Sequence, residues 1–380
     1  MNILDVQINS AGKPKTVKGP KGTKFNLTNV RNVPHDVQLC LENLEPFSGT
    51  IVFPNNGNSP ILPACFAAFN KDSKIVIHES DSHDYKAIQD SLKGSEEFRF
   101  QLGSDLELIN TEGSFLAVFR IPLGFDRLLC FDVMERLNHV LPDKSQVLIT
   151  MAKKRYKDLI KKLNKEFSGG QVLGRNRDAV LFKGLTSKSK DKWTSRINAI
   201  EVNAIDADLS MYTRPGVFSH GRVDAGGLAL YETLELNSDE SFLELGCGAG
   251  LVGLLAAIRC AKLQESYKGE MVLVDSSCRA IECAKKNVES LGFNVECVLE
   301  DDYETDQSFD VFAGNPPYYA NHRIASYFIE TAAKVLGEGG RLYLVSKHGQ
   351  LMEEMAKEKG FTVDTVKRRG YDVLIGRKLY

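Results

Sequence analysis

Hydrophobic runs bounded by turn-forming or polar residues recur along the second half of the chain. Four of them, at residues 241–245, 270–274, 294–299 and 309–314, have the length of buried strands. An apolar segment at 251–257 follows the first run and is expected to be helical. Apolar strands separated by helices are typical of a parallel sheet with both faces covered. The pattern therefore predicts an α/β fold for this half.

The first half repeats this pattern in a fainter form. Strands are predicted at 50–53, 74–79 and 114–120, and an apolar helix at 62–69 follows the first of them. The loop after the first strand has one glycine, and the last strand runs into Ile-Pro-Leu at 121–123. We therefore predict two tandem Rossmann-like units, of which the first is degenerate.

Length and composition favour two globular domains. The chain of 380 residues exceeds the usual size of one core, and its contents of 43% hydrophobic and 26% charged residues are ordinary. We expect a first domain at 1–190, a linker at 191–210 and a second domain at 211–380. No apolar run is long enough to span a membrane, and the first ten residues do not have the character of a signal peptide. A cytoplasmic protein is the expectation.

Cysteines and histidines show no ligand pattern. The eight cysteines contain no C-x-x-C pair, and the seven histidines have no metal-ligand spacing. We therefore expect reduced, buried thiols and no metal site.

Charge is divided unevenly along the chain. Residues 1–200 carry 29 Lys and Arg against 22 Asp and Glu, whereas residues 201–380 carry 19 against 28. Phosphate contacts provide most non-specific RNA affinity, so the basic segment 143–196 predicts an RNA-facing surface, with a solvated helix face as the alternative. The N-terminal lysines between 13 and 24 either add to this surface or form a soluble arm. The candidate RNA-binding residues are Lys153, Lys154, Arg155, Lys157, Lys161, Arg175 and Arg177.

A glycine-rich loop connects the first strand of the second half to its helix. It reads Glu-Leu-Gly-Cys-Gly-Ala-Gly over residues 244–250. Glycines allow a tight turn and a close approach of a ligand to the backbone, and the helix offers free N–H groups. Gly248, Gly250 and Gly253 also form a G-x-G-x-x-G pattern, and Asp275 ends the next strand. The spacing therefore fits a dinucleotide-binding dehydrogenase as well.

Three features favour S-adenosylmethionine over NAD. Glu244 can face the cationic amino end of S-adenosylmethionine, and it would repel a pyrophosphate. Asp301 and Asp302 follow the third strand, where a side chain can accept from the adenine amine. The fourth strand ends in a further polar loop, and such loops gather at the carboxyl ends of parallel strands. The candidate cofactor-binding residues here are Glu244, Gly246, Cys247, Gly248, Gly250, Asp275, Asp301 and Asp302.

The loop after the fourth strand consists of Asn315, Pro316, Pro317 and Tyr318. The asparagine amide and the Pro316 carbonyl supply two acceptors, and Tyr318 supplies a ring for stacking. Pro316 biases Asn315 away from helical backbone angles, so the chain leaves the strand extended. Two acceptors aimed at one NH2 group would hold its lone pair toward an electrophile. An ordinary proline-rich turn is the alternative.

Residues 211–380 resemble class I S-adenosylmethionine-dependent methyltransferases. Among these they are similar to the guanine-N2 methyltransferases that modify the RNA of the small or the large ribosomal subunit. The marks are Pro-Gly-Val-Phe-Ser at 215–219, Gly-Arg-Val-Asp-Ala-Gly at 221–226, the two loops above, and the segments 339–345 and 371–375. The resemblance implies a seven-stranded sheet with an antiparallel last strand. It also implies an amino-terminal half that binds RNA without cofactor.

The resemblance also implies roles for individual residues. Asn315 and the Pro316 carbonyl would hold the guanine amine for direct displacement, without a strong general base, while Tyr318 stacks the base. Asp275 would bind the ribose, and Asp301 and Asp302 the adenine. Phe218 and Asp224, the remaining candidate cofactor-binding residues, would close the pocket, with a helix cap as the alternative for Asp224.

Other functions stay open at this point. The pair Tyr318 and Tyr319 is shared with relatives that methylate adenine N6 or a protein glutamine. A non-catalytic rRNA-binding assembly factor and a dehydrogenase are the further alternatives. We expect ribosomal RNA or a ribosomal subunit as the partner, no membrane or metal, and a monomer.

Overall fold

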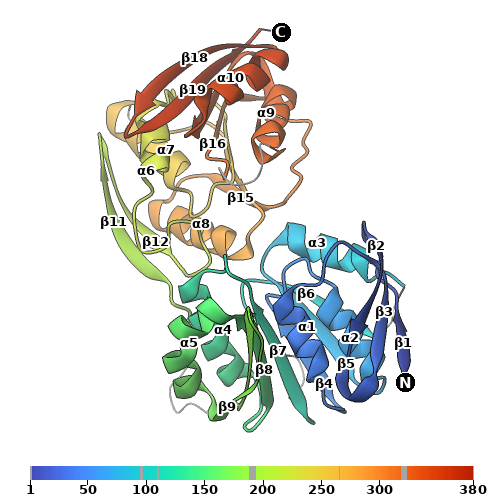
Figure 1. Cartoon of the computed structure of the whole chain (residues 1–380). Helices are drawn as coiled ribbons and strands as arrows, with labels where there is room; N and C mark the ends of the chain where they lie inside the picture. The colour runs from blue at the N-terminus through green and yellow to red at the C-terminus, as the bar shows by residue number, and fades with distance from the viewer. Residues whose placement is uncertain are drawn as a thin grey trace. The chain divides into compact units, whose positions relative to one another are not determined.

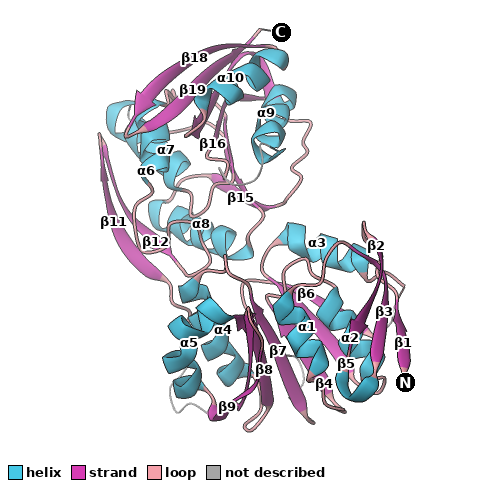
Figure 2. Ribbon diagram, in the orientation of Figure 1, coloured by secondary structure: helices cyan, strands magenta, loops and turns pink. Residues whose placement is uncertain are grey.

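The computed structural model describes residues 2–94, 97–108, 111–187, 194–264, 266–317 and 323–379. The chain divides into two compact units, Met1–Ser195 and Arg196–Tyr380 (Figure 1). Each unit combines a central sheet with helices (Figure 2). No helix in the described ranges has both the length and the apolar character needed to cross a bilayer.

A seven-stranded sheet forms the centre of the first unit. Its order is β6-β5-β4-β7-β8-β10-β9. The first five strands in this order are parallel, and β10 runs antiparallel to both of its neighbours. The strands are β4 (Thr50–Pro54), β5 (Lys74–Glu79), β6 (Phe98–Leu102), β7 (Phe115–Ile121), β8 (Gln146–Ala152), β9 (Ser168–Arg175) and β10 (Ala179–Leu185).

Helices cover both faces of this sheet and bury separate cores. One core contains Leu41 of α1 and Phe66 of α2 against Ile51. The other contains Met134 of α4 and Leu163 of α5. The helices are α1 (His35–Glu42), α2 (Ile61–Phe69), α3 (Ser82–Ser91), α4 (Arg127–Val140) and α5 (Lys153–Glu166).

A small three-stranded sheet precedes the first unit's main sheet in the chain. It consists of β1 (Ile3–Val6), β2 (Lys13–Lys18) and β3 (Lys24–Val30), with the short 3-10 helix η1 (Pro20–Gly22) between the last two. Phe25 and Leu27 of β3 are buried in the same core as α1 and α2. The N-terminal lysines therefore lie on a folded sheet, and the alternative of a soluble arm was wrong because alternate residues of β3 are apolar and buried.

The second unit has a sheet of the same topology. Its order is β15-β14-β13-β16-β17-β19-β18, and β19 runs antiparallel to both neighbours while the first five strands are parallel. The strands are β13 (Phe242–Leu245), β14 (Met271–Asp275), β15 (Val295–Leu299), β16 (Phe309–Gly314), β17 (Leu336–Ser346), β18 (Phe361–Arg368) and β19 (Tyr371–Lys378). The predicted fold of two tandem Rossmann-like units is confirmed.

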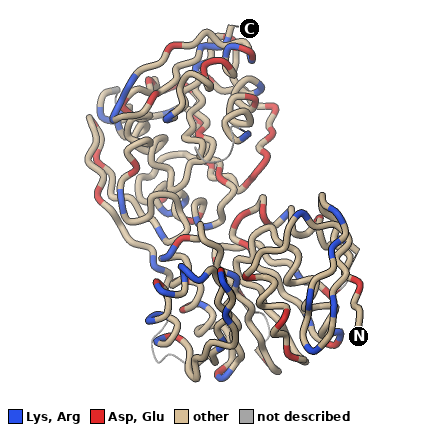
Figure 3. Tube along the Cα trace, viewed as in Figure 1, with Lys and Arg blue, Asp and Glu red and all other residues tan. Residues whose placement is uncertain are grey.

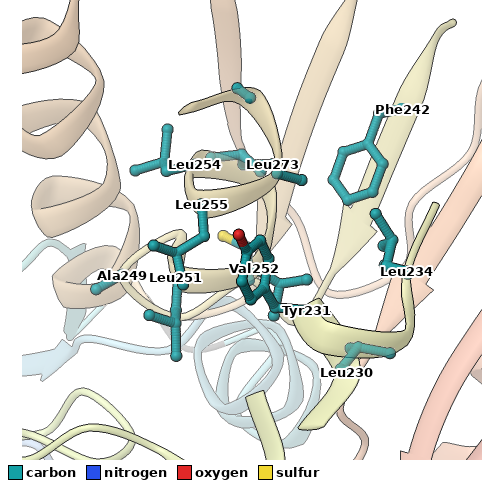
Figure 4. Packing of buried hydrophobic residues seen from close by; sticks show 14 of the residues in the cluster. Leu230, Tyr231, Leu234, Phe242, Ala249, Leu251, Val252, Leu254, Leu255 and Leu273 are labelled. Carbon is teal, nitrogen blue, oxygen red and sulfur yellow. The ribbon is translucent and has the colours of Figure 1, made fainter. Parts of the chain in front are cut away.

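Two helical layers also enclose the second sheet. Tyr231 of α6 and Leu254 and Leu255 of α7 pack in one core with Phe242 of β13 (Figure 4). Phe328 of α9 belongs to the core on the other face. The helices are α6 (Ala225–Thr233), α7 (Leu251–Gln264), α8 (Cys278–Leu291), α9 (Arg323–Val335) and α10 (Gly349–Glu358).

A β-hairpin opens the second unit. Its strands are β11 (Asn198–Ala204) and β12 (Ala207–Thr213), and β12 packs on α7 and α8. Val202, Leu209 and Met211 are buried in the core of that layer. Much of the segment 191–210, expected as a linker, is therefore strand in the described ranges.

Candidate active site

The glycine loop lies between β13 and α7 at the carboxyl edge of the second sheet. Gly246, Gly248 and Gly250 have φ angles of 67°, 56° and 85°, in the left-handed region that favours glycine. A Cβ atom on Gly248 would meet no atom within 4 Å, so the backbone is open to a ligand at this position. The loop has the geometry that its glycines predict.

Glu244 lies beneath the loop and is only 4% exposed. Its Oε2 accepts a hydrogen bond of 2.8 Å from the Gly253 N–H in the first turn of α7. Burial raises the pKa of Glu244 to about 8, although the N–H groups of Gly253 and Val252 oppose the shift. The carboxyl group therefore anchors the helix N-terminus, next to where the sequence expects the ligand's amino group.

Asp275 ends β14 and ties the second strand to the glycine loop. Its Oδ2 accepts from the Gly248 N–H at 2.8 Å, and its Oδ1 accepts from the Ser277 N–H at 2.8 Å. An ionised carboxylate has about four acceptor positions, and Asp275 uses two of them on these backbone N–H groups. Asp275 thus shapes the loop as well as facing the predicted ligand region.

The loop after β15 carries the half-buried Asp301 and the exposed Asp302. It is held to α9 by a bond of 2.7 Å from the Tyr303 N–H to Tyr327 Oη. Burial raises the pKa of Tyr327, and the charges of Asp302 and Asp301 add to the shift, which reports their proximity. The acidic pair therefore sits on an anchored loop next to the described start of α9.

Cys247 is buried, with 4% exposure. Its N–H donates to the Val274 carbonyl at 3.0 Å, and burial raises the pKa of its thiol well above the ordinary value. This position joins the loop to β14 through its backbone, and its thiol is not activated as a nucleophile. The cysteines in the described ranges are free of disulfides.

The amide of Asn315, directly after β16, contacts a residue far away in sequence. Its Nδ2 donates to Asp224 Oδ2 at 2.9 Å. The same oxygen accepts from the Gly227 N–H at 2.6 Å and so caps the N-terminus of α6. The helix-cap alternative for Asp224 is therefore present, together with a contact to the predicted catalytic asparagine.

The turns before α6 are held by buried side chains. Phe218 is 62% exposed, and Ser219, next to it, has a positive φ of 58°. Arg279 of α8 is 1% exposed and donates to the Pro215 carbonyl at 2.9 Å. The exposed ring of Phe218 is thus presented from a fixed turn, available to a ligand.

A small cleft lies beside the loop after β16. Pro316 and Pro317 line it together with Ser346 at the end of β17 and His348 at the start of α10. Tyr318, the last residue of the predicted catalytic set, lies outside the described residues. The end of β17 and the start of α10 therefore lie next to the predicted amine-binding loop.

Asn287 of α8 is a site residue that the sequence did not indicate. It is fully buried, and its Nδ2 donates to the Ala249 carbonyl of the glycine loop at 2.9 Å. Its Oδ1 accepts from the Tyr212 N–H at 2.7 Å, and Nδ2 also donates to the Tyr212 carbonyl. One amide thereby joins the loop to β12. An asparagine on the apolar face of a helix was the available signal.

Most of the predicted RNA-binding side chains are exposed on α5 and at the β9–β10 turn. Arg155 is the exception, because its Nη2 donates to the Phe125 carbonyl at 2.7 Å and it is half-buried. Its guanidinium therefore stabilises the turn before α4, and its role as an RNA contact stays a prediction. The exposed ones are Lys153, Lys154, Lys157, Lys161, Arg175 and Arg177.

A model of the methyltransferase small domain family matches the segment from β12 to β19. The match covers residues 208–375. This segment contains the glycine loop, Asp224, Asp275 and Asn315. Membership of the class I S-adenosylmethionine-dependent methyltransferases, predicted from these motifs, is confirmed for this unit.

Several curated relatives share the name ribosomal RNA small subunit methyltransferase C. Ribosomal RNA small subunit methyltransferase C of Hahella chejuensis is 30% identical over 165 residues, which cover 42% of this chain and 45% of that protein. The protein of that name from Hamiltonella defensa is 24% identical over 315 residues, covering 81% and 88%. The chain spans about half the length of several others that it matches, including the one from Stutzerimonas stutzeri.

A solved structure covers both units. It is the T. thermophilus 16S rRNA N2 methyltransferase in complex with AdoMet and guanosine. Its TM-score is 0.71 at 21% identity, and the match covers 88% of this chain and 90% of that one. This likeness concerns the fold, and it extends to the degenerate first unit.

Proposed function

We propose that this chain transfers a methyl group from S-adenosylmethionine to the exocyclic N2 amine of a guanine in ribosomal RNA. The observation that carries the proposal is the Asn315 amide, which follows β16 and is held by Asp224 at 2.9 Å. An asparagine so held, on the sheet edge that carries the glycine loop, is suited to grip a planar amine. The names of the relatives support rRNA as the substrate.

The residues of the glycine loop fit S-adenosylmethionine. The backbone at Gly248 is open, Asp275 is held beside it by the Gly248 N–H, and Asp301 and Asp302 lie on an anchored loop. Glu244 would face the ammonium group in its ionised form. When bound, S-adenosylmethionine supplies an activated methyl group on a sulfonium centre.

The chain's own contribution to the reaction is placement. Asn315 Oδ1 and the Pro316 carbonyl would accept the two N–H groups of the guanine amine and favour a pyramidal nitrogen over the planar ground state. The nitrogen would then lie in line with the methyl group. No strong general base is required, because the proton becomes acidic once the nitrogen is alkylated.

The small cleft beside Pro316 and Pro317 adds apolar and polar groups next to the predicted amine-binding loop. Apolar side chains line one part of it, while Ser346 and His348 provide polar groups. Purine bases are bound by such a combination of apolar contact and a few hydrogen bonds. To reach Asn315 beside the cleft, the guanine would have to be unpaired or extruded.

The first unit lacks the features of the predicted site, which supports a single active site per chain. Its strand β7 holds the place of β16 but ends in Ile121, Pro122 and Leu123. Glu79 ends β5 in the place of Asp275, yet it is 3% exposed, and burial raises its pKa well above the ordinary range, with Asp84 adding to the shift. Glu79 is therefore closed to a ligand, whereas Asp275 is only half-buried. RNA recognition is the proposed role of this unit.

Transfer of tritiated methyl groups tests the proposal. Substrates are small-subunit particles, large-subunit particles and naked rRNA, and the labelled product is digested to nucleosides. The proposal expects N2-methylguanosine from the wild type and a loss of about 100-fold or more for Asn315→Ala. Label in N6-methyladenosine or in protein glutamine would overturn the target, and full activity of Asn315→Ala would overturn the site.

A further inference from the structure

The carboxylate of Asp224 is shared between a helix N-terminus and the predicted catalytic amide. Oδ2 accepts from both the Gly227 N–H and Asn315 Nδ2, at 2.6 and 2.9 Å. Oδ1 lies 3.4 Å from the hydroxyl of Ser219. The cap bond fixes the position of the carboxylate, and Asn315 is bound to that fixed point.

An ionised carboxylate only accepts hydrogen bonds. The NH2 group of the Asn315 amide must therefore face Asp224. The amide oxygen in that position would face another acceptor. Because the amide is planar, Oδ1 is directed away from Asp224. An unheld asparagine could turn by 180° and present a donor to the incoming amine, which itself donates.

We propose that Asp224 is a positioning residue that selects the acceptor orientation of Asn315. This inference rests on the proposed function, because the orientation matters for a target that is an NH2 group. It also reassigns Asp224, which the sequence placed among the cofactor-binding residues. The contact joins the turn region before α6 to the loop after β16 across 91 residues of sequence.

The test separates the cap from the contact with Asn315. Serine at position 224 keeps a capping oxygen but shortens the side chain, while asparagine keeps an acceptor oxygen at full length. Asp126→Ser is the matched control, because Asp126 caps α4 through Leu129 N–H at 2.6 Å in the other unit. Rates, affinity for S-adenosylmethionine, melting temperature and the NMR signals of the Asn315 side-chain amide are measured for each.

The inference expects Asp224→Ser to lower kcat about 10- to 100-fold, as small misplacements of catalytic groups do. Affinity for S-adenosylmethionine stays within about twofold, as expected when the change is confined to the Asn315 amide. Asp224→Asn restores most of the rate, and in the Asn315→Ala background Asp224→Ser has no further effect on kcat. The Asn315 side-chain NH2 resonances shift in Asp224→Ser but not in Asp126→Ser.

Unchanged kcat in Asp224→Ser, or independent effects of the two changes, would overturn the inference. The NMR readout does not depend on turnover. If the wild type methylated no guanine, the proposed function would fail. Independently of that result, unshifted Asn315 side-chain signals in Asp224→Ser would show that Asp224 does not hold the amide.

A second observation concerns charge on the first unit. Lys and Arg lie on both the β2–β3 region and α5 (Figure 3). A chain of contacts connects these two regions through α1: the Lys153 N–H bonds to the Asp178 carbonyl, Asn176 donates to the His35 carbonyl, and Gln38 donates to the Lys18 carbonyl at 3.0 Å. We define the basic strip as Lys153, Lys154, Arg175, Arg177, His35, Lys18 and Lys21.

Few carboxylates interrupt this strip. Asp36 is buried against Arg120 at 2.7 Å, and Asp178 lies 3.6 Å from His35. Glu42 is exposed and accepts from Gln38. In the described part of the chain, Lys18 and Lys21 form no ion pair, and both are exposed.

We infer that the basic strip follows an RNA sugar-phosphate backbone from α5 to the η1 turn. The inference extends the RNA surface of the proposed function to the N-terminal sheet. Lysines spaced along a connected surface suit a polyanion with regularly spaced charges. A single phosphate ligand would require one convergent cluster instead.

Salt dependence of rRNA binding tests the strip. Removing two phosphate contacts with Lys18→Gln/Lys21→Gln lowers the magnitude of the slope of log K against log salt by about 1.4 to 1.8. Lys71→Gln/Lys74→Gln is the control, with two exposed lysines at the amino end of β5. Equal slopes for the two variants would overturn the strip while leaving methyl transfer intact, and a wild type that binds no rRNA would overturn both.

Discussion

Replacing Glu244 by glutamine is expected to remove a pH dependence of stability from the ligand-free protein. The carboxyl group is 4% exposed, and burial raises its pKa to about 8 from an ordinary 4.5. Between these two values the folded protein holds a proton that the unfolded chain has released. Stability from this group is therefore fully present below about pH 4.5 and is lost as the pH rises through 8.

The size of the effect follows from the shift. Integrated from pH 5 to pH 8, a shift of this size lowers the free energy of unfolding by roughly 3 to 4 kcal/mol. For a domain of this size that corresponds to roughly 10 °C in melting temperature. Glutamine has the same shape, does not ionise, and can still accept from the Gly253 N–H through its amide oxygen.

Differential scanning calorimetry at pH 5, 6, 7 and 8 measures the difference between wild type and Glu244→Gln. We expect the variant to gain on the wild type steadily as the pH rises. Glu289→Gln, an exposed position on α8, is the control. A constant difference between wild type and Glu244→Gln across this range would show that Glu244 is ionised in the folded protein, contrary to the reasoning.

Four further outcomes follow from the loop geometry. Gly253→Ala should lower the free energy of unfolding by about 2 kcal/mol in urea titration, because its Cβ would meet Leu273 at 2.9 Å. Gly248→Ala, with open space but a φ of 56°, should cost about 1 kcal/mol and weaken S-adenosylmethionine binding in calorimetry. Asn287→Ala should cost about 3 kcal/mol by the same urea assay, since it leaves buried groups unpaired. S-adenosylmethionine should bind with release of a proton from Glu244 near pH 7, so its affinity should rise with pH between 6 and 7.5, and not in Glu244→Gln.

Local patterns were sufficient to predict the strands and the glycine loop. Apolar runs specify buried parallel strands wherever they lie, and glycines specify left-handed backbone, so the predicted run at 270–274 differs from β14 by one residue. The same logic failed at 198–213, where a hairpin has alternating polar and apolar residues and buries only one face. Its polar face made the segment look like a linker.

The sequence did not predict which side chains contact one another. The bond between Asp224 and Asn315 joins residues that are 91 positions apart, and its existence depends on how α6 and β16 meet. Arg155 looked like its lysine neighbours on α5, but a helix turn directs it toward the Phe125 carbonyl. Composition gives the charge of a segment, whereas the fold decides which charges remain exposed.

The two seven-stranded sheets have the same topology but differ at the edge where the predicted site lies. Both carry an acid at the end of the second strand, Glu79 and Asp275, and in both that acid interacts with backbone N–H groups of the loop after the first strand. In the second unit the loop is built on left-handed glycines, and Asp275 stays half-exposed. In the first, Asn55 and Asn56 are buried in that loop, and Glu79 is buried with them. Asn55 and Gly57 keep left-handed backbone in that loop, with φ of 43° and 69°, yet the acid beneath it is buried. Restoring Asn-Pro-Pro after β7 alone would therefore not create a second site.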